Sequence, residues 1–209
     1  NHEMIEMGAL CEEVIALASR ALTENDKSLA ARVAPLDSEI DRKERDIENL
    51  CLKLLLQQQP VAKDLRQISA ALKMITDLER IADQASDISE IALQFGDEDY
   101  IKEPEHIALM AKYAVRMVKD GVQSYVNRDL ELARSLEKSD DMVDELFEKI
   151  KQDLIELIKK DGKNADQAIL FMMIAKYLER ISDHAVNIGE WVEYAVTGFH
   201  NKDKGEKTL

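Results

Sequence analysis

The chain has 209 residues, of which 45% are hydrophobic, and contains only 7 glycines and 3 prolines, a composition typical of long helices. Its formal net charge of −14 argues against direct binding to nucleic-acid phosphates. No apolar run reaches the about 18 residues of a membrane span, no secretory signal opens the chain, and two isolated cysteines lie in helical patterns. These features predict a cytoplasmic protein with a helical core.

Six long helices are predicted from apolar residues that recur every three or four positions. They span, in chain order, residues 3–22, 26–58, 60–95, 104–127, 130–160 and 165–196. Asn25 or Asp26 can cap the second helix, and Asp129 can cap the fifth. Pro60 ends the second helix and starts the third, which Gly96 terminates.

The order of these helices, three and then three, predicts the domain organisation. Antiparallel neighbours joined by short turns form up-and-down bundles. We therefore expect an all-α fold of two tandem, pseudo-symmetric three-helix bundles. The first comprises residues 1–98 and the second residues 99–198, and residues 199–209 form a polar tail.

An internal repeat supports this division into halves. The segment LERIADQASDISE at residues 78–90 returns as LERISDHAVNIGE at residues 178–190. The offset is 178 − 78 = 100, and 8 of the 13 positions are identical. A repeat of this length indicates two copies of one supersecondary unit.

Acidic side chains recur at helical spacing beside the apolar stripes of both halves. The third and sixth predicted helices carry Glu79, Asp83 and Asp87, and Glu179, Asp183 and Asn187. The helices that precede them carry Asp37 and Asp41, and Asp140 and Asp144. Residues four apart share one face of a helix, and each pair lies at a similar distance from the turn between its two helices. We therefore expect the acidic pairs of each half to face one another at the same height.

Two interpretations of these stripes remain open. Like charges four residues apart cost about 0.2–0.5 kcal/mol per pair, and a bound cation would relieve that cost. An all-oxygen cage suits magnesium, manganese or calcium, as well as iron or zinc bound by carboxylates. Alternatively, the stripes are a solvated acidic face that Arg80 and Arg180 partly neutralise. Asn187 would leave the second site with one charge fewer than the first, which has Asp87.

The chain resembles the PhoU family of phosphate-signalling regulators along nearly its whole length. The resemblance lies in PVAKDLR at residues 60–66, DLERIAD at residues 77–83 and LERISDHAVNI at residues 178–188. It implies two tandem three-helix bundles, a cytoplasmic protein that is commonly a homodimer, and negative regulation of the phosphate-starvation response. Its implied partners are PstB, the ATPase subunit of the phosphate transporter, and the sensor kinase PhoR, so the membrane is reached only through proteins.

The resemblance also bears on metal binding, because some family members hold iron or zinc clusters through Glu/Asp-x-x-x-Asp motifs. Those motifs correspond here to the pairs Asp37 and Asp41, Glu79 and Asp83, Asp140 and Asp144, and Glu179 and Asp183. We expect divalent or ferric ions at these pairs, with the choice among iron, zinc, manganese and magnesium open.

Three alternative functions would use these residues differently. A metal-free helical adaptor would use the acidic stripes only as solvated surface. A ferritin-like oxidase needs two Glu-x-x-His motifs, and the only candidate ends at His106. A phosphotransfer bundle would need His184 as acceptor, but His184 lies off the acidic stripe. No serine or cysteine is accompanied by a suitable base, so the sequence predicts no enzyme.

Overall fold

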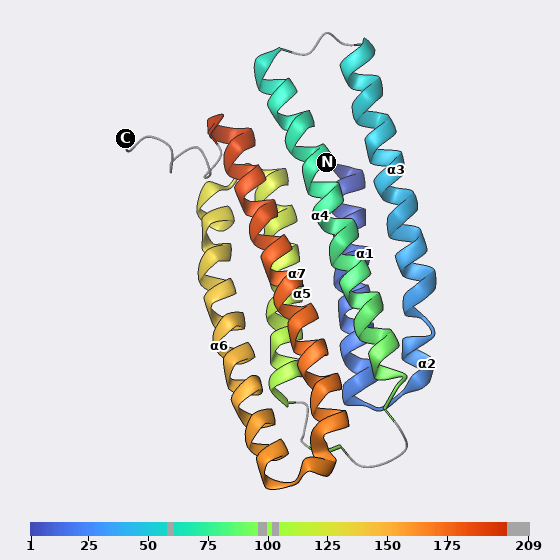
Figure 1. Cartoon of the computed structure of the whole chain (residues 1–209). Coiled ribbons are helices and arrows are strands. Elements are labelled where there is room, and N and C mark those ends of the chain that lie inside the picture. Colours follow the sequence, from blue (N-terminus) through green and yellow to red (C-terminus); the bar gives the residue numbers. More distant parts are fainter. Residues whose placement is uncertain (58–60, 96–99, 102–104, 200–209) are drawn as a thin grey trace.

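In the computed structural model, six long helices form two three-helix bundles side by side (Figure 1). The structure describes residues 1–57, 61–95, 100–101 and 105–199. The long helices are α1 (His2–Thr23), α3 (Val33–Gln57), α4 (Ala62–Ala92), α5 (Glu105–Asn127), α6 (Leu130–Lys160) and α7 (Ala165–Thr197). A single turn, α2 (Lys27–Ala30), and a 3₁₀ segment, η1 (Gly162–Asn164), complete the described elements, none of which is a strand. The predicted all-α class is confirmed.

The second predicted helix differs from the structure at its start. Instead of running on from residue 26, the chain makes the turn α2, passes through Ala31 and Arg32, and starts again as α3 at Val33. Pro35 explains the interruption, because it has no N–H to donate and its ring clashes with a preceding carbonyl inside a helix. The break places Pro35 in the first turn of α3, where proline is tolerated. The roles predicted for Pro60 and Gly96 concern residues outside the described part of the chain.

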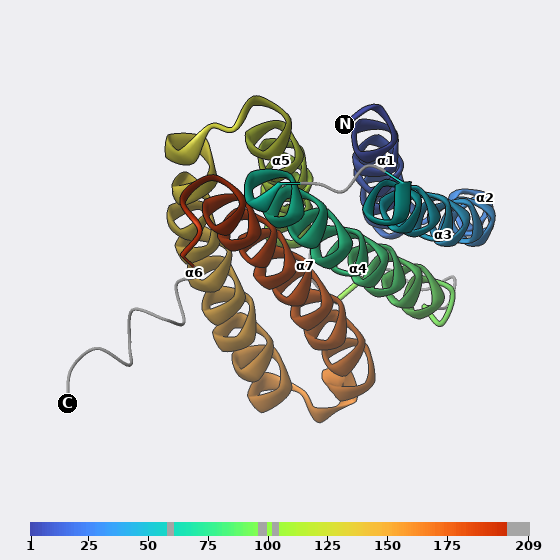
Figure 2. The same ribbon diagram turned by 90° about the horizontal axis from the view of Figure 1, so that it is seen from above.

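The helices divide into a central set and an outer set (Figures 1 and 2). Helices α1, α4, α5 and α7 pack on one another across the junction of the two bundles, and α4 and α7 make the most extensive contact. Helix α3 covers α1 and α4 on one side, and α6 covers α5 and α7 on the other. No described helix is long and apolar enough to cross a membrane.

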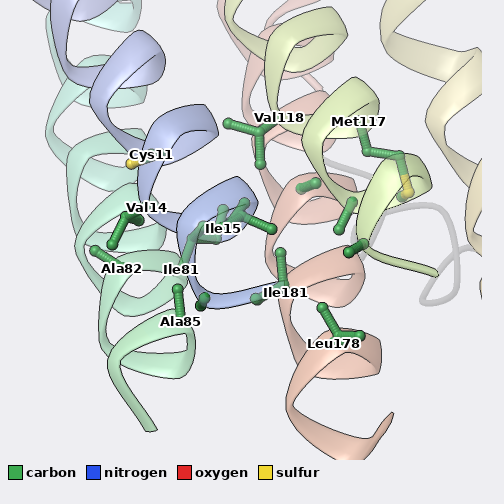
Figure 3. Close-up of a cluster of buried hydrophobic side chains, with 14 of the residues drawn as sticks. Cys11, Val14, Ile15, Ile81, Ala82, Ala85, Met117, Val118, Leu178 and Ile181 are labelled. Carbon is green, nitrogen blue, oxygen red and sulfur yellow. The ribbon is translucent and has the colours of Figure 1, made fainter. Parts of the chain in front are cut away.

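The centre of the molecule is built from the small and branched side chains of the repeated segment. Ile81 of α4 and Ile181 of α7 are fully buried and lie where the two helices meet, and Ala82, 1% exposed, lies beside Val14 of α1 (Figure 3). Ile15 of α1 and Val118 of α5, both fully buried, close this layer from the other side. The apolar stripe beside each acidic stripe is therefore the core face of its helix, and this fixes the acidic stripe near the surface between paired helices.

Matching turns show that the two halves repeat in backbone as well as in sequence. Asn25 (φ 48°) and Arg128 (φ 56°) are the only described non-glycine residues with positive φ, and they lie 128 − 25 = 103 residues apart. Each precedes a cap: the side chain of Asp26 accepts a hydrogen bond from a backbone N–H of α2, and Asp129 accepts one from Leu132 at the start of α6. This offset of 103 relates α3 to α6, whereas the offset of 100 relates α4 to α7.

Two acidic clusters as candidate metal centres

The first acidic cluster joins α3 to α4. Asp37 and Asp41 lie one turn apart on α3, and Glu79, Asp83 and Asp87 follow at four-residue intervals on α4. Burial raises the pKa of Asp37, and the charges of Asp83, Asp41 and Asp87 raise it further. The structure therefore brings carboxylates of two helices, predicted from spacing alone, into one electrostatic environment.

Glu44 belongs to this cluster and was missed by the sequence analysis. It lies three residues after Asp41 on α3, and its pKa is raised by burial first and then by Glu48, Asp41 and other charges. The pKa of Glu79 rises to about 7, through burial first and then through Asp83 and Glu44. The signal was present in the sequence, since positions 37, 41 and 44 share one helix face.

The second acidic cluster joins α6 to α7 in the same way. Burial raises the pKa of Asp183 to about 6, and the charges of Glu179 and Asp140 contribute. Burial also raises the pKa of Asp144, with Glu179 as the largest nearby charge. The four carboxylates predicted for this half thus influence one another, as those of the first half do.

Lys176 is a second residue of these clusters that the sequence analysis missed. Its ammonium forms an ion pair with Glu179 Oε2, one turn further along α7. Its positive charge also lowers the pKa values of Asp183 and Asp144 against the effect of burial. Lys176 is thus a cation supplied to the second cluster by the chain itself.

One carboxylate oxygen in each cluster is suited to an ion because it lacks a hydrogen bond of standard geometry within the described residues. Asp37 Oδ1 and Asp140 Oδ1 are buried without such a hydrogen bond, and they are equivalent, since 140 − 37 = 103. The hydroxyls of Ser86 and Ser182 lie near enough to these two carboxyls to lower the pKa of each, but they do not bond to these oxygens in good geometry. Buried polar atoms are normally hydrogen-bonded, so an orphaned oxygen in each cluster suits a ligand. However, no three His, Cys, Asp or Glu side chains within the described ranges are already gathered as a metal site. The residues fit a metal ion in their chemistry, but their side chains would have to turn to bring three of them to one ion.

Asn187 is directed to a different place from the other predicted ligands. Its amide nitrogen donates to Asp77 Oδ1 at 3.3 Å, across the contact between α7 and α4. His184 Nδ1 lies 2.9 Å from the same oxygen, and Asp77 is only 7% exposed. Asp77 is therefore a buried acceptor that ties the two repeats together, and His184 is part of this contact.

The pseudo-symmetric position carries a different contact. Residues 77 and 187 correspond to residues 177 and 87 when the two repeats are exchanged. Burial raises the pKa of Tyr177, and the negative charge of Asp87 raises it further. Asp87 therefore lies between the first cluster and α7 of the other repeat, so it belongs both to the acidic cluster and to the contact between the halves.

His106, the histidine considered for a ferritin-like site, belongs to no group of metal-ligating side chains among the described residues. His106 Nδ1 is 3.9 Å from Asp153 Oδ2, beyond hydrogen-bond distance. The glutamate of its Glu-x-x-His spelling, Glu103, lies outside the described residues. Nothing in the described part of α5 supplies the second such motif of a ferritin-like site.

Comparison with known proteins gives a consistent result for the whole chain. The family model described as PhoU domain matches twice, at residues 4–92 and 107–192. A phosphate-specific transport system accessory protein PhoU homolog of Clostridium acetobutylicum is 35% identical, over 94% of this chain and 90% of its own. The homolog of Synechocystis sp. is 37% identical, over 94% and 87%.

Solved structures show the same similarity. The crystal structure of PhoU from Pseudomonas aeruginosa superposes with a TM-score of 0.89 and 31% identity, covering 95% of each chain. The phosphate transport system regulatory protein PhoU from Streptococcus pneumoniae gives a TM-score of 0.86 at 26% identity, over 95% of this chain and 94% of its own.

Proposed function

Because the chain belongs to the PhoU family, whose domain it carries twice, we propose that it is a regulatory accessory protein of a phosphate-specific transport system. The observation that carries this proposal is that the match includes both repeats and nearly the full length of relatives that bear this name. The protein restrains phosphate uptake and the phosphate-starvation response when phosphate is plentiful.

It acts through protein contacts rather than catalysis. The partners are the transporter ATPase subunit PstB and the sensor kinase PhoR, met at the cytoplasmic face of the membrane, and the protein works as a homodimer. Exposed large apolar side chains on helices of both repeats support a role in protein contacts, among them Leu52 (46% exposed) and Met173 (41%). The formal net charge of −14 further favours basic surfaces on those partners.

The acidic clusters bind divalent or ferric ions in this proposal. The supporting observations are the orphaned oxygens of Asp37 and Asp140 and the mutual repulsion within each cluster. The residues that would hold the ions are Asp37, Asp41, Glu44, Glu79, Asp83 and Asp87 in the first half and Asp140, Asp144, Glu179 and Asp183 in the second. A multivalent cation there would cross-link α3 to α4 and α6 to α7 and offset the carboxylate repulsion.

The regulatory role is tested by deleting the gene and measuring a phosphate-starvation reporter in phosphate-rich medium. Expression should rise in the deletion strain and return to the wild-type level when the intact gene is restored. Unchanged expression in the deletion strain would reject the role. The contact with the transporter ATPase is tested separately, by purifying tagged protein from detergent-solubilised membranes. If the ATPase does not copurify with the tagged protein, that contact is rejected.

The metal sites are tested by elemental analysis of protein purified without a chelator. The double variant Glu79→Gln/Asp83→Asn should lose the metal of the first half and keep that of the second. The matched control is Glu39→Gln/Asp46→Asn, which removes the same charge from exposed positions on the opposite face of α3. Equal metal content in all three proteins would reject the assignment.

A further inference from the structure

The two acidic clusters differ at positions that the repeat makes equivalent. On the α3 and α6 pair, Glu44 of the first half corresponds to Phe147, since 147 − 44 = 103. On the α4 and α7 pair, Thr76 corresponds to Lys176, since 176 − 76 = 100. The first half thus has a carboxylate and a neutral hydroxyl where the second half has an aromatic ring and an ammonium.

These two replacements in the second half form one structural unit. The Lys176 ammonium lies 5.5 Å from the centre of the Phe147 ring, a cation–π distance, while it pairs with Glu179. The side chain of Glu179 is only 17% exposed, so the ammonium reaches a carboxylate that is largely shielded from water. In the first half, the Thr76 hydroxyl instead donates to the backbone carbonyl of Leu72 at 3.3 Å.

The third difference is Asp87 against Asn187, which removes another negative charge from the second stripe. The second half does carry further acids at the flank of α6 where the first half has none, among them Asp141, Glu145 and Glu148, and these three are exposed. Glu148 is already paired with Lys151 at 2.6 Å. The two halves therefore differ within the predicted ligand stripes themselves. In the second half, the Lys176 ammonium already contacts an oxygen of the predicted ligand Glu179.

We propose that Lys176 is a tethered counter-ion of the second cluster, so that multivalent cations fill the first cluster before the second. This inference rests on the proposed metal binding. A metal ion entering the second cluster must displace the ammonium from Glu179 Oε2 or share the site with its positive charge. The first cluster has six carboxylates along its stripes and a threonine at the equivalent position. The charge of Arg80 lowers the pKa of Glu79 and Asp83, but among the described residues no side-chain cation forms an ion pair with these carboxylates, as Lys176 does with Glu179.

The experiment measures Mn²⁺ binding to the full chain after treatment with a chelator, by the electron paramagnetic resonance signal of free Mn²⁺. The background Glu79→Gln/Asp83→Asn isolates the second cluster, and Lys176→Thr is then added to give it the residue found in the first half. Removing one positive charge a few ångströms from a divalent ion should tighten binding about tenfold. Lys159→Thr in the same background is the control, since it removes an equal charge from an exposed pair with Glu156 on α6.

Three outcomes are distinguishable. Tighter binding with Lys176→Thr and no change with Lys159→Thr supports the tethered counter-ion. Equal binding with and without Lys176, in a protein that still binds Mn²⁺, overturns it and leaves the metal sites in place. Absence of Mn²⁺ binding to the wild-type chain overturns both proposals. Circular dichroism and the urea midpoint of each variant confirm that the fold is retained, which is expected because Lys176 is 46% exposed.

Discussion

Replacement of Asp83 by Asn should have opposite effects on stability with and without metal. Burial raises the pKa of Asp83 and the charges of Asp41 and Asp87 raise it further, whereas a hydrogen bond with Glu79 one turn away lowers it. The charge of Asp83 in turn raises the pKa of Glu79, so the two carboxylates repel each other once both are ionised. With about 0.2–0.5 kcal/mol for each like-charge neighbour, neutralising Asp83 in metal-free protein should raise the free energy of unfolding by about 1 kcal/mol. For a chain of this size that corresponds to an increase in Tm of about 2–4 °C.

With metal present, the sign should reverse. An ion that binds the folded wild type and is present at a free concentration of 100 times its Kd adds about 2.7 kcal/mol to the free energy of unfolding. The variant should lose most of that gain. The assay is urea unfolding at low ionic strength and pH 8, in chelator and in Mn²⁺, with Glu39→Gln as an exposed control on α3. A variant that is less stable than wild type in chelator, or a wild type that Mn²⁺ does not stabilise, would refute the reasoning.

Three further predictions concern pH, packing and the contact between the repeats. In chelator, the urea midpoint should fall as the pH rises from about 5 to about 8, because folded Glu79, with a pKa of about 7, retains a proton that unfolded glutamate has released; a flat profile would contradict this. Gly189→Val should lower the free energy of unfolding by about 1–3 kcal/mol, because a Cβ there would lie 2.8 Å from a backbone oxygen of α6. Gly162→Val, where nothing lies within 4 Å, is its control, and equal midpoints would count against the packing argument. Asp77→Ala should lower the free energy of unfolding by about 1–3 kcal/mol, because it leaves His184 without its hydrogen-bond partner, and Asp77→Asn should lower it less. Calorimetry that finds the Asn variant less stable than the Ala variant would oppose this assignment.

The sequence predicted the helices well because their stability depends on local periodicity, caps and breakers. Asp129 accepts the hydrogen bond expected of a cap, at 3.0 Å from the Leu132 nitrogen, and α6 ends at Lys160 as predicted. The break before α3 was not predicted, because the helix start at Asp26 and the apolar pattern after it were read as one continuous helix. Pro35, which cannot lie in the interior of that helix, was left out of the reasoning. Here a local rule about proline overrides a periodic pattern that crosses it.

The acidic clusters were predicted only in part because spacing within a helix does not show what lies opposite it. The pairs on α3 and α4 lie near enough for their charges to influence one another, since both helices present their acidic stripes beside their apolar ones. Asn187, in contrast, was grouped with the second cluster because it continues the stripe, but its amide reaches Asp77 on the other repeat. Lys176 was missed because its importance comes from its contacts with Glu179 and the Phe147 ring, which only the folded structure reveals.

The antiparallel contact between α4 and α7 has a consequence for how such a chain could have arisen. The two helices are copies of one segment, and they contact each other through the same surface. A twofold symmetric dimer requires such a self-complementary surface, so a single repeat already carries the surface needed to pair with a second copy of itself. In such a pair every substitution appears twice and must suit both copies. Fusion into a single polypeptide removes this restriction, so that one copy can acquire an ammonium or an amide while the other retains its carboxylates. Specialisation of the halves is therefore a benefit that duplication within one gene gives and that self-association of a shorter ancestor does not.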